Sequence, residues 1–291
     1  MYLVIGGDSV VGGSLVKALQ RRGQHTISST RRRRQTGEDQ IYLDYEDSVS
    51  FTAPYGVEYV FIVAAVTSYD LCENDTQSHQ INVELIPRLA ERLLRQGMFV
   101  TFVSTNLVFG GALAWPREDD PHAPGIAYAR QKSLAESRLI SSSARCGALD
   151  RCAVVRLTKV LDQMTPPIPT WMKNWSQGAV VEPFSDFVIA PISSRFVGDA
   201  LATIAEQRAC GNLHVSGAEN VTYTRLAEVL AARFKVSSEL IAPTTATTAG
   251  VRLPFKPKFS GLSMEQTTQQ VGIEPQSLTD VVSDLVENRE S

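Results

Sequence analysis

Tyr128 and Lys132 form the pair whose residue types and spacing best suit proton transfer in this sequence. A separation of four residues places both side chains on one face of a helix, one turn apart. A positive charge near a phenol favours the phenolate, so Lys132 is expected to lower the pKa of Tyr128 toward the range useful for proton exchange. The pair predicts general acid–base chemistry at an oxygen atom.

A glycine-rich segment near the beginning of the chain predicts a dinucleotide site. It reads Gly6-Gly7-Asp8-Ser9-Val10-Val11-Gly12-Gly13 and lies between an apolar strand-like run and a helical pattern. Glycines at a strand-to-helix turn let the backbone approach a pyrophosphate, and the N-terminus of the helix attracts its charge. The residues expected to contact the cofactor here are Gly6, Ser9, Val10, Val11 and Gly12.

The end of the second strand-like run indicates which dinucleotide is bound. NAD-specific sites have an Asp or Glu here for the ribose 2′-hydroxyl. This chain instead reads Ser29-Thr30-Arg31-Arg32-Arg33-Arg34. Hydroxyl and guanidinium groups bind a phosphate that a carboxylate would repel, so Ser29, Thr30 or Arg31 is expected to recognise the 2′-phosphate of NADP(H). The alternative is a solvated basic loop or a patch that binds polyanions.

These segments resemble those of the extended short-chain dehydrogenases/reductases. The glycine run resembles their G-x-x-G-x-x-G turn, with Ser9 in place of the middle glycine. The segment Val103-Ser104-Thr105-Asn106-Leu107-Val108-Phe109-Gly110 resembles the one that carries their catalytic Ser or Thr. The resemblance implies that Thr105 hydrogen-bonds the substrate carbonyl, that Tyr128 and Lys132 complete the catalytic group and contact the cofactor, and that Asp44 lies beside the adenine.

A narrower resemblance, to dTDP-4-dehydrorhamnose reductases, extends over nearly the whole chain. Residues 64–73, which read Ala-Ala-Val-Thr-Ser-Tyr-Asp-Leu-Cys-Glu, resemble their "A-x-T-x-x-D-x-x-E" run, and Asn82-Val83 follows it. This resemblance implies cofactor contacts at Ala64 and Ala65 and substrate contacts at Thr67, Asn106 and Lys256. Lys256 replaces the family's usual arginine, so a bidentate contact with a diphosphate would become a point-charge contact.

The alternation of short apolar runs with amphipathic stretches predicts the elements that position these residues. Strands are expected at residues 2–5, 26–30, 41–43, 59–64, 99–103 and 153–157, and a helix over 80–96. We therefore predict an α/β fold, a Rossmann-type doubly wound parallel sheet with a smaller C-terminal substrate-binding lobe. Residues 1–160 would form the NADP-binding domain and 161–291 the lobe, with about 185–215 returning to the sheet.

The proline-rich second region contains fewer regular patterns. Helices are expected at 196–209, 223–234 and 278–286, and a strand at 213–215. Trp171 and Trp175 are four residues apart. Trp171 is a candidate for stacking on the substrate, and core packing is the alternative.

The combination predicts an NADPH-dependent reductase of a keto group on a nucleotide-activated sugar. An NAD(P)-dependent nucleotide-sugar epimerase is the nearest alternative, and a non-catalytic NADP-binding regulatory subunit is the alternative of another class. The 4,6-dehydratases resemble "T-D-E" where this chain has Thr105-Asn106-Leu107, which argues against dehydration. The resemblance also leaves a homodimer open.

Composition excludes several other classes of protein. The net charge is −3, from 28 basic and 31 acidic residues, without the basic surplus typical of nucleic-acid binding. The four cysteines form no C-x-x-C pair and the four histidines show no metal-ligand spacing, so no metal site is expected. Met1 leads directly into a strand-like run, and the apolar runs are too short to span a bilayer, which predicts a cytoplasmic protein without a membrane anchor.

Overall fold

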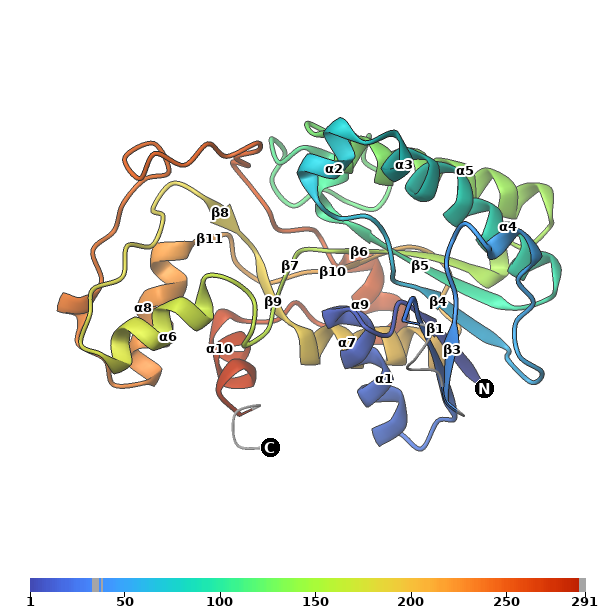
Figure 1. Cartoon of the computed structure of the whole chain (residues 1–291), viewed down its shortest axis with the longest axis horizontal. Helices are drawn as coiled ribbons and strands as arrows, with labels where there is room; N and C mark the ends of the chain where they lie inside the picture. Colours follow the sequence, from blue (N-terminus) through green and yellow to red (C-terminus); the bar gives the residue numbers. More distant parts are fainter. Residues whose placement is uncertain (33–36, 38, 288–291) are drawn as a thin grey trace.

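The computed structural model describes residues 1–32, 37 and 39–287. Within them, a seven-stranded parallel sheet carries helices on both faces (Figure 1). Its order is β10-β6-β5-β4-β1-β2-β3. These strands are β1 (Tyr2–Ile5), β2 (Thr26–Thr30), β3 (Gln40–Tyr42), β4 (Tyr59–Ile62), β5 (Phe99–Thr105), β6 (Cys152–Leu157) and β10 (Gly211–Val215). The predicted Rossmann-type fold is confirmed.

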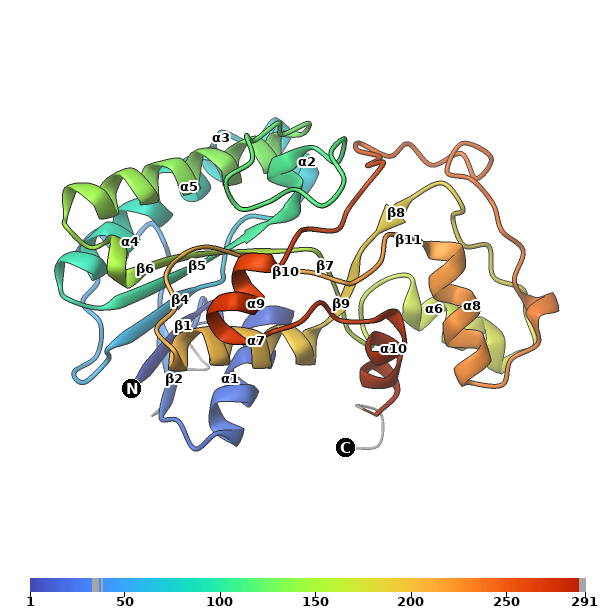
Figure 2. The same cartoon turned by 180° about the vertical axis from the view of Figure 1, so that it is seen from behind.

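Two helical layers cover the sheet, one above it and one below it in Figure 1. Figure 2 shows the same layers from behind. One layer contains α1 (Val10–Arg21), α7 (Ser194–Glu206) and α9 (Glu265–Val271). The other contains α2 (Tyr69–Asn74), α3 (Thr76–His79), α4 (Ile86–Arg95) and α5 (Ala127–Arg145). Apolar residues fill the interface on each face of the central strands, which explains why β1 and β4 read as continuous apolar runs.

The predicted helix over 80–96 is divided in the structure. Residues Gln80–Leu85 form a π-helical segment, η3, and α4 follows directly. Leu89 and Leu93 of α4 are buried against the sheet, as their spacing predicts. The π-helical segment coincides with the buried Asn82, whose contacts are described below.

The lobe lies at the left of Figure 1. It contains α6 (Ile168–Ser176), α8 (Tyr223–Arg233), α10 (Leu278–Glu287) and the antiparallel pair β8 (Val188–Ile189) and β11 (Val221–Thr222). A separate apolar core holds it together and includes Trp171, Trp175 and Leu226. A parallel pair, β7 (Lys159–Leu161) and β9 (Pro191–Ser193), connects the lobe to the sheet.

Parts of the second region also belong to the sheet layer. Strand β10 pairs with β6, and α7 packs its apolar face beside α1. The helices expected at 196–209, 223–234 and 278–286 correspond to α7, α8 and α10. The boundary at residue 160 stays a prediction. Across residues 1–32, 37 and 39–287, the helices are too short or too polar to traverse a lipid bilayer.

Candidate active site

The C-terminal ends of three neighbouring strands bring the predicted site residues to one edge of the sheet. The glycine turn follows β1, Ala64 and Ala65 follow β4, and Thr105 ends β5. Strands β1, β4 and β5 are consecutive and parallel, so their C-terminal ends face the same side. Ligands of open α/β sheets bind at this edge.

The glycine turn is packed tightly against its own backbone. Gly6 has a φ of +99°, and a Cβ atom on Gly12 would lie 2.1 Å from the carbonyl oxygen of Gly6. Ser9 caps α1: its hydroxyl accepts from Gly12 N at 3.0 Å and donates to Gly6 O at 2.8 Å. The substitution of serine for the middle glycine therefore supplies a helix cap, while Val10 remains 44% exposed at the first turn.

The hydroxyl groups at the end of β2 contact the glycine turn. Ser29 is buried, and its Oγ accepts from Gly6 N at 3.0 Å. Thr30 Oγ1 donates to Asp8 Oδ2 at 2.6 Å and accepts from Arg32 N at 3.0 Å. The two hydroxyls predicted to recognise a phosphate thus hold the turn in place, and Asp8 adds a carboxylate that the sequence reasoning did not consider.

Charged residues predicted to contact the cofactor follow β2 and β3. The side chain of Arg31 is exposed, and its charge acts on the buried phenol of Tyr45, which donates to Ala64 O at 2.7 Å. Asp44 follows β3, and its carboxylate accepts from Glu46 N at 3.2 Å. Arg33 and Arg34 of the predicted arginine run lie outside the described residues.

Thr105 is placed at the junction of β5 and the 3-10 helix η4 (Asn106–Phe109). Its Oγ1 accepts from Leu107 N at 3.3 Å and donates to Asn106 Oδ1 at 3.3 Å. The Asn106 amide donates to the backbone oxygen of Ser260 at 2.7 Å. Asn106, predicted to contact substrate, therefore fastens the strand end to the segment around Ser260.

Tyr128 lies in the first turn of α5. Burial raises the pKa of its phenol, and nearby Tyr69 and Cys72 raise it further. The rings of Tyr69 and Tyr128 have centroids 5.8 Å apart. The expected lowering of this pKa by Lys132 is not found, because burial dominates. The Tyr128 phenol is protonated at neutral pH.

Lys132 is buried one turn further along α5. Its ammonium group donates to Val103 O at 2.7 Å and lies 3.7 Å from the centre of the Phe102 ring. Burial lowers the pKa of Lys132 to about 7, although the negative charge of Glu136 acts in the opposite direction. The Lys132 ammonium therefore lies beside the C-terminal end of β5.

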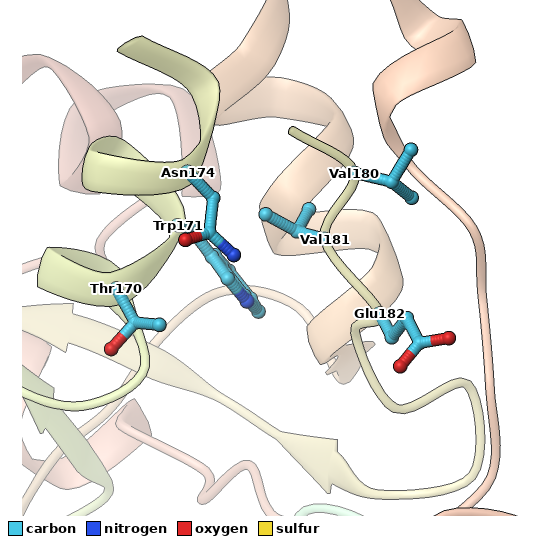
Figure 3. Close-up of a pocket in the computed structure, with 6 residues that line it drawn as sticks. All are labelled: Thr170, Trp171, Asn174, Val180, Val181 and Glu182. Atoms are coloured by element: carbon cyan, nitrogen blue, oxygen red, sulfur yellow. The ribbon is translucent and has the colours of Figure 1, made fainter. Parts of the chain in front are cut away.

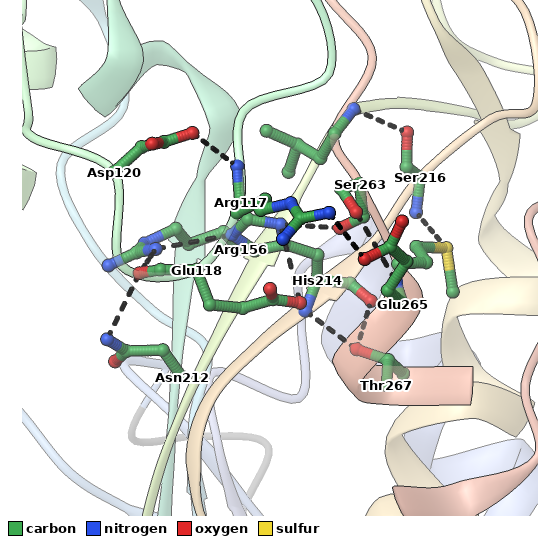
Figure 4. A network of polar contacts seen from close by, with 12 residues as sticks. Arg117, Glu118, Asp120, Arg156, Asn212, His214, Ser216, Ser263, Glu265 and Thr267 are labelled. Carbon is green, nitrogen blue, oxygen red and sulfur yellow. Dashed lines mark hydrogen bonds and ion pairs between the residues drawn. The ribbon is translucent and has the colours of Figure 1, made fainter. Parts of the chain in front are cut away.

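A buried polar network surrounds Glu136, one helical turn after Lys132 on α5. Glu136 accepts from the Ser104 hydroxyl through Oε1 and from the Arg156 guanidinium through Oε2. Arg156 also contacts His214 Nε2 at 3.2 Å, and His214 Nδ1 donates to Ser263 O at 2.8 Å (Figure 4). Burial and the charge of Arg156 lower the pKa of His214 to about 3, so this imidazole is neutral.

Asn82 stabilises the loop after β4. Its amide exchanges two hydrogen bonds of 2.9 Å with the backbone of Val66 and donates to Gln131 Oε1 at 2.7 Å. Gln131 lies next to Lys132 and donates in turn to Cys72 O at 3.1 Å. This network holds the segment that carries Thr67, whose side chain is exposed, against α5.

Two adjoining hollows open in the lobe and share Trp171 and Glu182. The first, of about 320 Å³, is shown in Figure 3 with Thr170, Trp171, Asn174, Val180, Val181 and Glu182 around it. The second, of about 300 Å³, is lined largely by proline and aromatic side chains, among them Pro167, Phe187 and Tyr223. Trp171 thus packs in the core of the lobe and also lines both hollows.

Lys256 lies on a segment that leads from the lobe to the C-terminal end of β5. Its ammonium forms an ion pair with Asp186 at 2.6 Å and is half exposed. Nearby, Lys258 N donates to Gly111 O at 3.0 Å, and the segment continues to Ser260. The contact that the structure gives for Lys256 is thus with Asp186 of the lobe.

Over residues 1–291 the sequence matches the family model described as the RmlD substrate binding domain. The chain belongs to this family. Two relatives are similar in sequence. The spore coat polysaccharide biosynthesis protein SpsK of Bacillus subtilis is 24% identical over 99% of this chain and 98% of its own. The methionine adenosyltransferase 2 subunit beta of Pongo abelii is 24% identical over 84% of this chain and 75% of its own.

Several solved structures have a similar fold. A dTDP-4-dehydrorhamnose reductase from Clostridium acetobutylicum superposes with a TM-score of 0.81 at 18% identity, covering 100% of this chain and 99% of the other. MoeE5, solved in complex with UDP-glucuronic acid and NAD, has a TM-score of 0.79 at 20% identity, with coverage of 100% and 99%. These likenesses support the fold.

Sequence reasoning found the edge of the sheet but missed several polar residues. Glu136 lies four residues after Lys132 on the same helix face, so its spacing could have identified it. Asp8 was inside the glycine segment, but its contact with Thr30 joins residues 22 positions apart. Arg156 and His214 meet only because β6 and β10 are neighbours.

Within the described residues, no group of three or more His, Cys, Asp or Glu side chains could hold a metal ion.

Proposed function

We propose that this protein reduces a keto group on a nucleotide-activated sugar, with NADPH as the hydride donor. The observation that supports the proposal is the hydrogen bond from Lys132 to Val103 O, because it joins α5, which carries Tyr128 one turn before Lys132, to the strand that ends at Thr105. Hydroxyl, phenol and ammonium groups at one edge suit proton transfer to a carbonyl oxygen. Membership of the RmlD substrate binding domain family supports a nucleotide-sugar substrate.

The close backbone packing of the turn after β1 would let a dinucleotide pyrophosphate approach the N-terminus of α1. Gly6, Ser9, Val10, Val11 and Gly12 would hold the pyrophosphate at the N-terminus of α1. Asp44 would lie near the adenine, and Ala64 and Ala65 would contact the dinucleotide after β4. The exposed guanidinium of Arg31 favours the 2′-phosphate. When bound, NADPH supplies a hydride to the carbonyl carbon.

The residues of the chain supply the proton and orient the substrate oxygen. Thr105 Oγ1 hydrogen-bonds the carbonyl oxygen, and Tyr128 donates its phenolic proton to the developing alkoxide. A phenol whose pKa is raised by burial is protonated at neutral pH, which suits the direction of reduction. In its protonated form, Lys132 would hold positive charge beside the end of β5, where its ammonium donates to Val103 O.

The nucleotide part of the substrate would lie in the lobe. The two hollows around Trp171 provide aromatic and apolar surface for a base, and Glu182 provides an acceptor for ribose or base N–H groups. Lys256 would contact the diphosphate as a point charge after exchanging its partner Asp186. Thr67 and Asn106 would face the sugar from the loops after β4 and β5.

A non-catalytic, cofactor-binding subunit is a second candidate. One relative is named as the beta subunit of a methionine adenosyltransferase. In addition, the Lys132 ammonium is hydrogen-bonded to Val103 O, and the pKa of Tyr128 is not lowered. The retained Tyr128, Lys132 and Thr105 favour catalysis.

The decisive experiment follows NADPH absorbance with a panel of dTDP- and UDP-linked keto sugars. Oxidation of NADPH that depends on one of them supports the reductase. Interconversion of two sugar nucleotides without net NADPH oxidation would instead identify an epimerase. Tight NADPH binding with neither reaction across the panel would support the non-catalytic subunit.

A further inference from the structure

We propose that Asp8 weakens the preference of this site for NADP(H) over NAD(H). The inference rests on the proposed dinucleotide site and adds a residue that opposes the phosphate preference of Arg31. A carboxylate near the end of the second strand accepts from the ribose 2′-hydroxyl of NAD(H) in many Rossmann-type sites. In this chain that carboxylate comes from the glycine turn rather than from β2.

The position of Asp8 is fixed by a contact between two elements. Asp8 Oδ2 accepts from Thr30 Oγ1 at 2.6 Å, and Thr30 is the last residue of β2. Thr30 is buried, and its Oγ1 also accepts from Arg32 N at 3.0 Å, so the threonine hydroxyl is held from both sides. The carboxylate is therefore held at the strand end where the adenine ribose of a dinucleotide is recognised.

The same geometry removes the two hydroxyls from phosphate recognition. The Thr30 hydroxyl donates its hydrogen bond to Asp8. Ser29 is 3% exposed, and its Oγ accepts a hydrogen bond from Gly6 N. Among the recognition residues that the sequence suggests, Arg31 has the exposed side chain. An exposed guanidinium and an anchored carboxylate at one strand end act in opposite directions on a 2′-phosphate.

Asp8 also retains the capacity to bind a ribose hydroxyl. Its side chain is exposed, and Oδ1 makes no hydrogen bond to any of residues 1–32, 37 and 39–287. No ion pair joins Asp8 to a Lys or Arg side chain within residues 1–32, 37 and 39–287. An ionised carboxylate accepts from the 2′-hydroxyl of NAD(H) and repels the 2′-phosphate of NADP(H). We therefore expect the wild-type protein to bind both dinucleotides.

The test is a calorimetric titration of NADPH and of NADH into the wild-type protein and the Asp8→Asn variant at low ionic strength. Asparagine keeps an acceptor for Thr30 but removes the charge. The ratio of the two dissociation constants should shift toward NADPH by about tenfold, the size expected for removal of one charge a few ångströms from a phosphate near the surface. A ratio that stays within twofold of wild type overturns the inference.

A matched variant controls for net charge. Asp150→Asn removes an exposed aspartate at the opposite, N-terminal end of β6, and it should leave the ratio at the wild-type value. An equal shift in both variants would overturn the role of Asp8, because it would show a general charge effect. Thermal melting of Asp8→Asn without cofactor, compared with wild type, reports whether the turn is intact.

The outcomes also separate this inference from the proposed function. If wild type binds neither dinucleotide, both the proposed function and the role of Asp8 are wrong. If wild type binds dinucleotides and Asp8→Asn leaves their ratio unchanged, only the role of Asp8 is overturned. Should Asp8→Asn melt well below wild type, Asp8→Ser, which also keeps an acceptor but no charge, provides the same comparison.

Discussion

Arg156 donates from both Nε and Nη2 to one oxygen of Glu136, at 3.0 and 2.9 Å, and both side chains are almost completely buried. Arg156 belongs to β6 and Glu136 to α5, so the pair fastens the helix to the sheet. Ser104, next to Thr105, donates to the other carboxylate oxygen. The pair thereby positions the helix that carries Tyr128 and Lys132 relative to the end of β5.

Replacement of Glu136 by Gln should destabilise the protein by about 3 kcal/mol. The substitution removes the carboxylate that is directly hydrogen-bonded to the buried guanidinium of Arg156, and breaking one side of a buried pair is costly. Urea unfolding, with the free energy extrapolated to water, measures the change. Glu91→Gln is the matched control, because its ion pair with Arg95 lies at the surface and should contribute about 0.5 kcal/mol.

Equal losses in the two variants would mean that burial of the Arg156–Glu136 pair adds nothing to its contribution. A structural role also predicts that Glu136→Gln slows any turnover through misplacement of α5, with cofactor affinity less affected. Measured kcat and cofactor dissociation constants on the same preparation separate these effects.

Lys132 makes the stability of the protein depend on pH. Its pKa is about 7 in the folded protein, because it is buried, and near 10.4 in an unfolded chain. Between these values the unfolded state binds more protons, so the free energy of unfolding rises with pH. The stability that the folded protein gains when Lys132 is neutral is fully present above about pH 10.4. It decreases as pH falls and is lost below about pH 7.

The variant Lys132→Met isolates this contribution. Relative to wild type, it should be most stabilised at and below about pH 7, and its advantage should shrink by about 1 kcal/mol per pH unit as pH rises toward 9. Urea unfolding of both proteins at pH 7, 8 and 9 gives the difference. A difference that does not change over this range would show that Lys132 keeps an ordinary pKa in the fold.

The strands of the sheet were predictable because they are buried on both faces. Runs such as Tyr2–Ile5 and Tyr59–Ile62 consist of apolar and aromatic residues, so local sequence alone indicates them. The short strands β8 and β11, each of two residues, carry no such pattern and depend on pairing across the lobe. The π-helical segment Gln80–Leu85 also has an ordinary helical pattern in sequence.

The candidate site was predictable in its location but not in its hydrogen bonds. The residue types of Thr105, Tyr128 and Lys132 and their order along the chain indicated the sheet edge. The contact of Lys132 with Val103 O, and that of Ser29 with Gly6 N, depend on the packing of separate elements. The pKa of Tyr128 likewise follows from burial, which spacing along a helix does not report.

Replacement of Tyr128 by Phe should lower ketone-dependent NADPH oxidation by about 100-fold or more. The variant keeps the ring beside Tyr69 but lacks the proton that the alkoxide receives, and general acid catalysis commonly contributes this much. Steady-state absorbance measurements give kcat, and fluorescence titration should give an NADPH dissociation constant close to that of wild type. Unchanged turnover would exclude Tyr128 as the proton donor. Tyr69→Phe serves as control, since it removes the neighbouring hydroxyl without removing the donor.

Arg31→Ala should weaken NADPH binding about tenfold and leave NADH binding within about twofold. The guanidinium is exposed at the end of β2, and a charge-assisted contact with a 2′-phosphate contributes about this much at the surface, whereas NADH has no phosphate there. Titration at two ionic strengths adds a second criterion, because the NADPH affinity of wild type should fall with salt more steeply than that of Arg31→Ala. Arg21→Ala provides a control, since this arginine pairs with Asp199 on the helical face away from the turn. Parallel losses for both dinucleotides would show that Arg31 supports the fold of the strand end instead of recognising the phosphate.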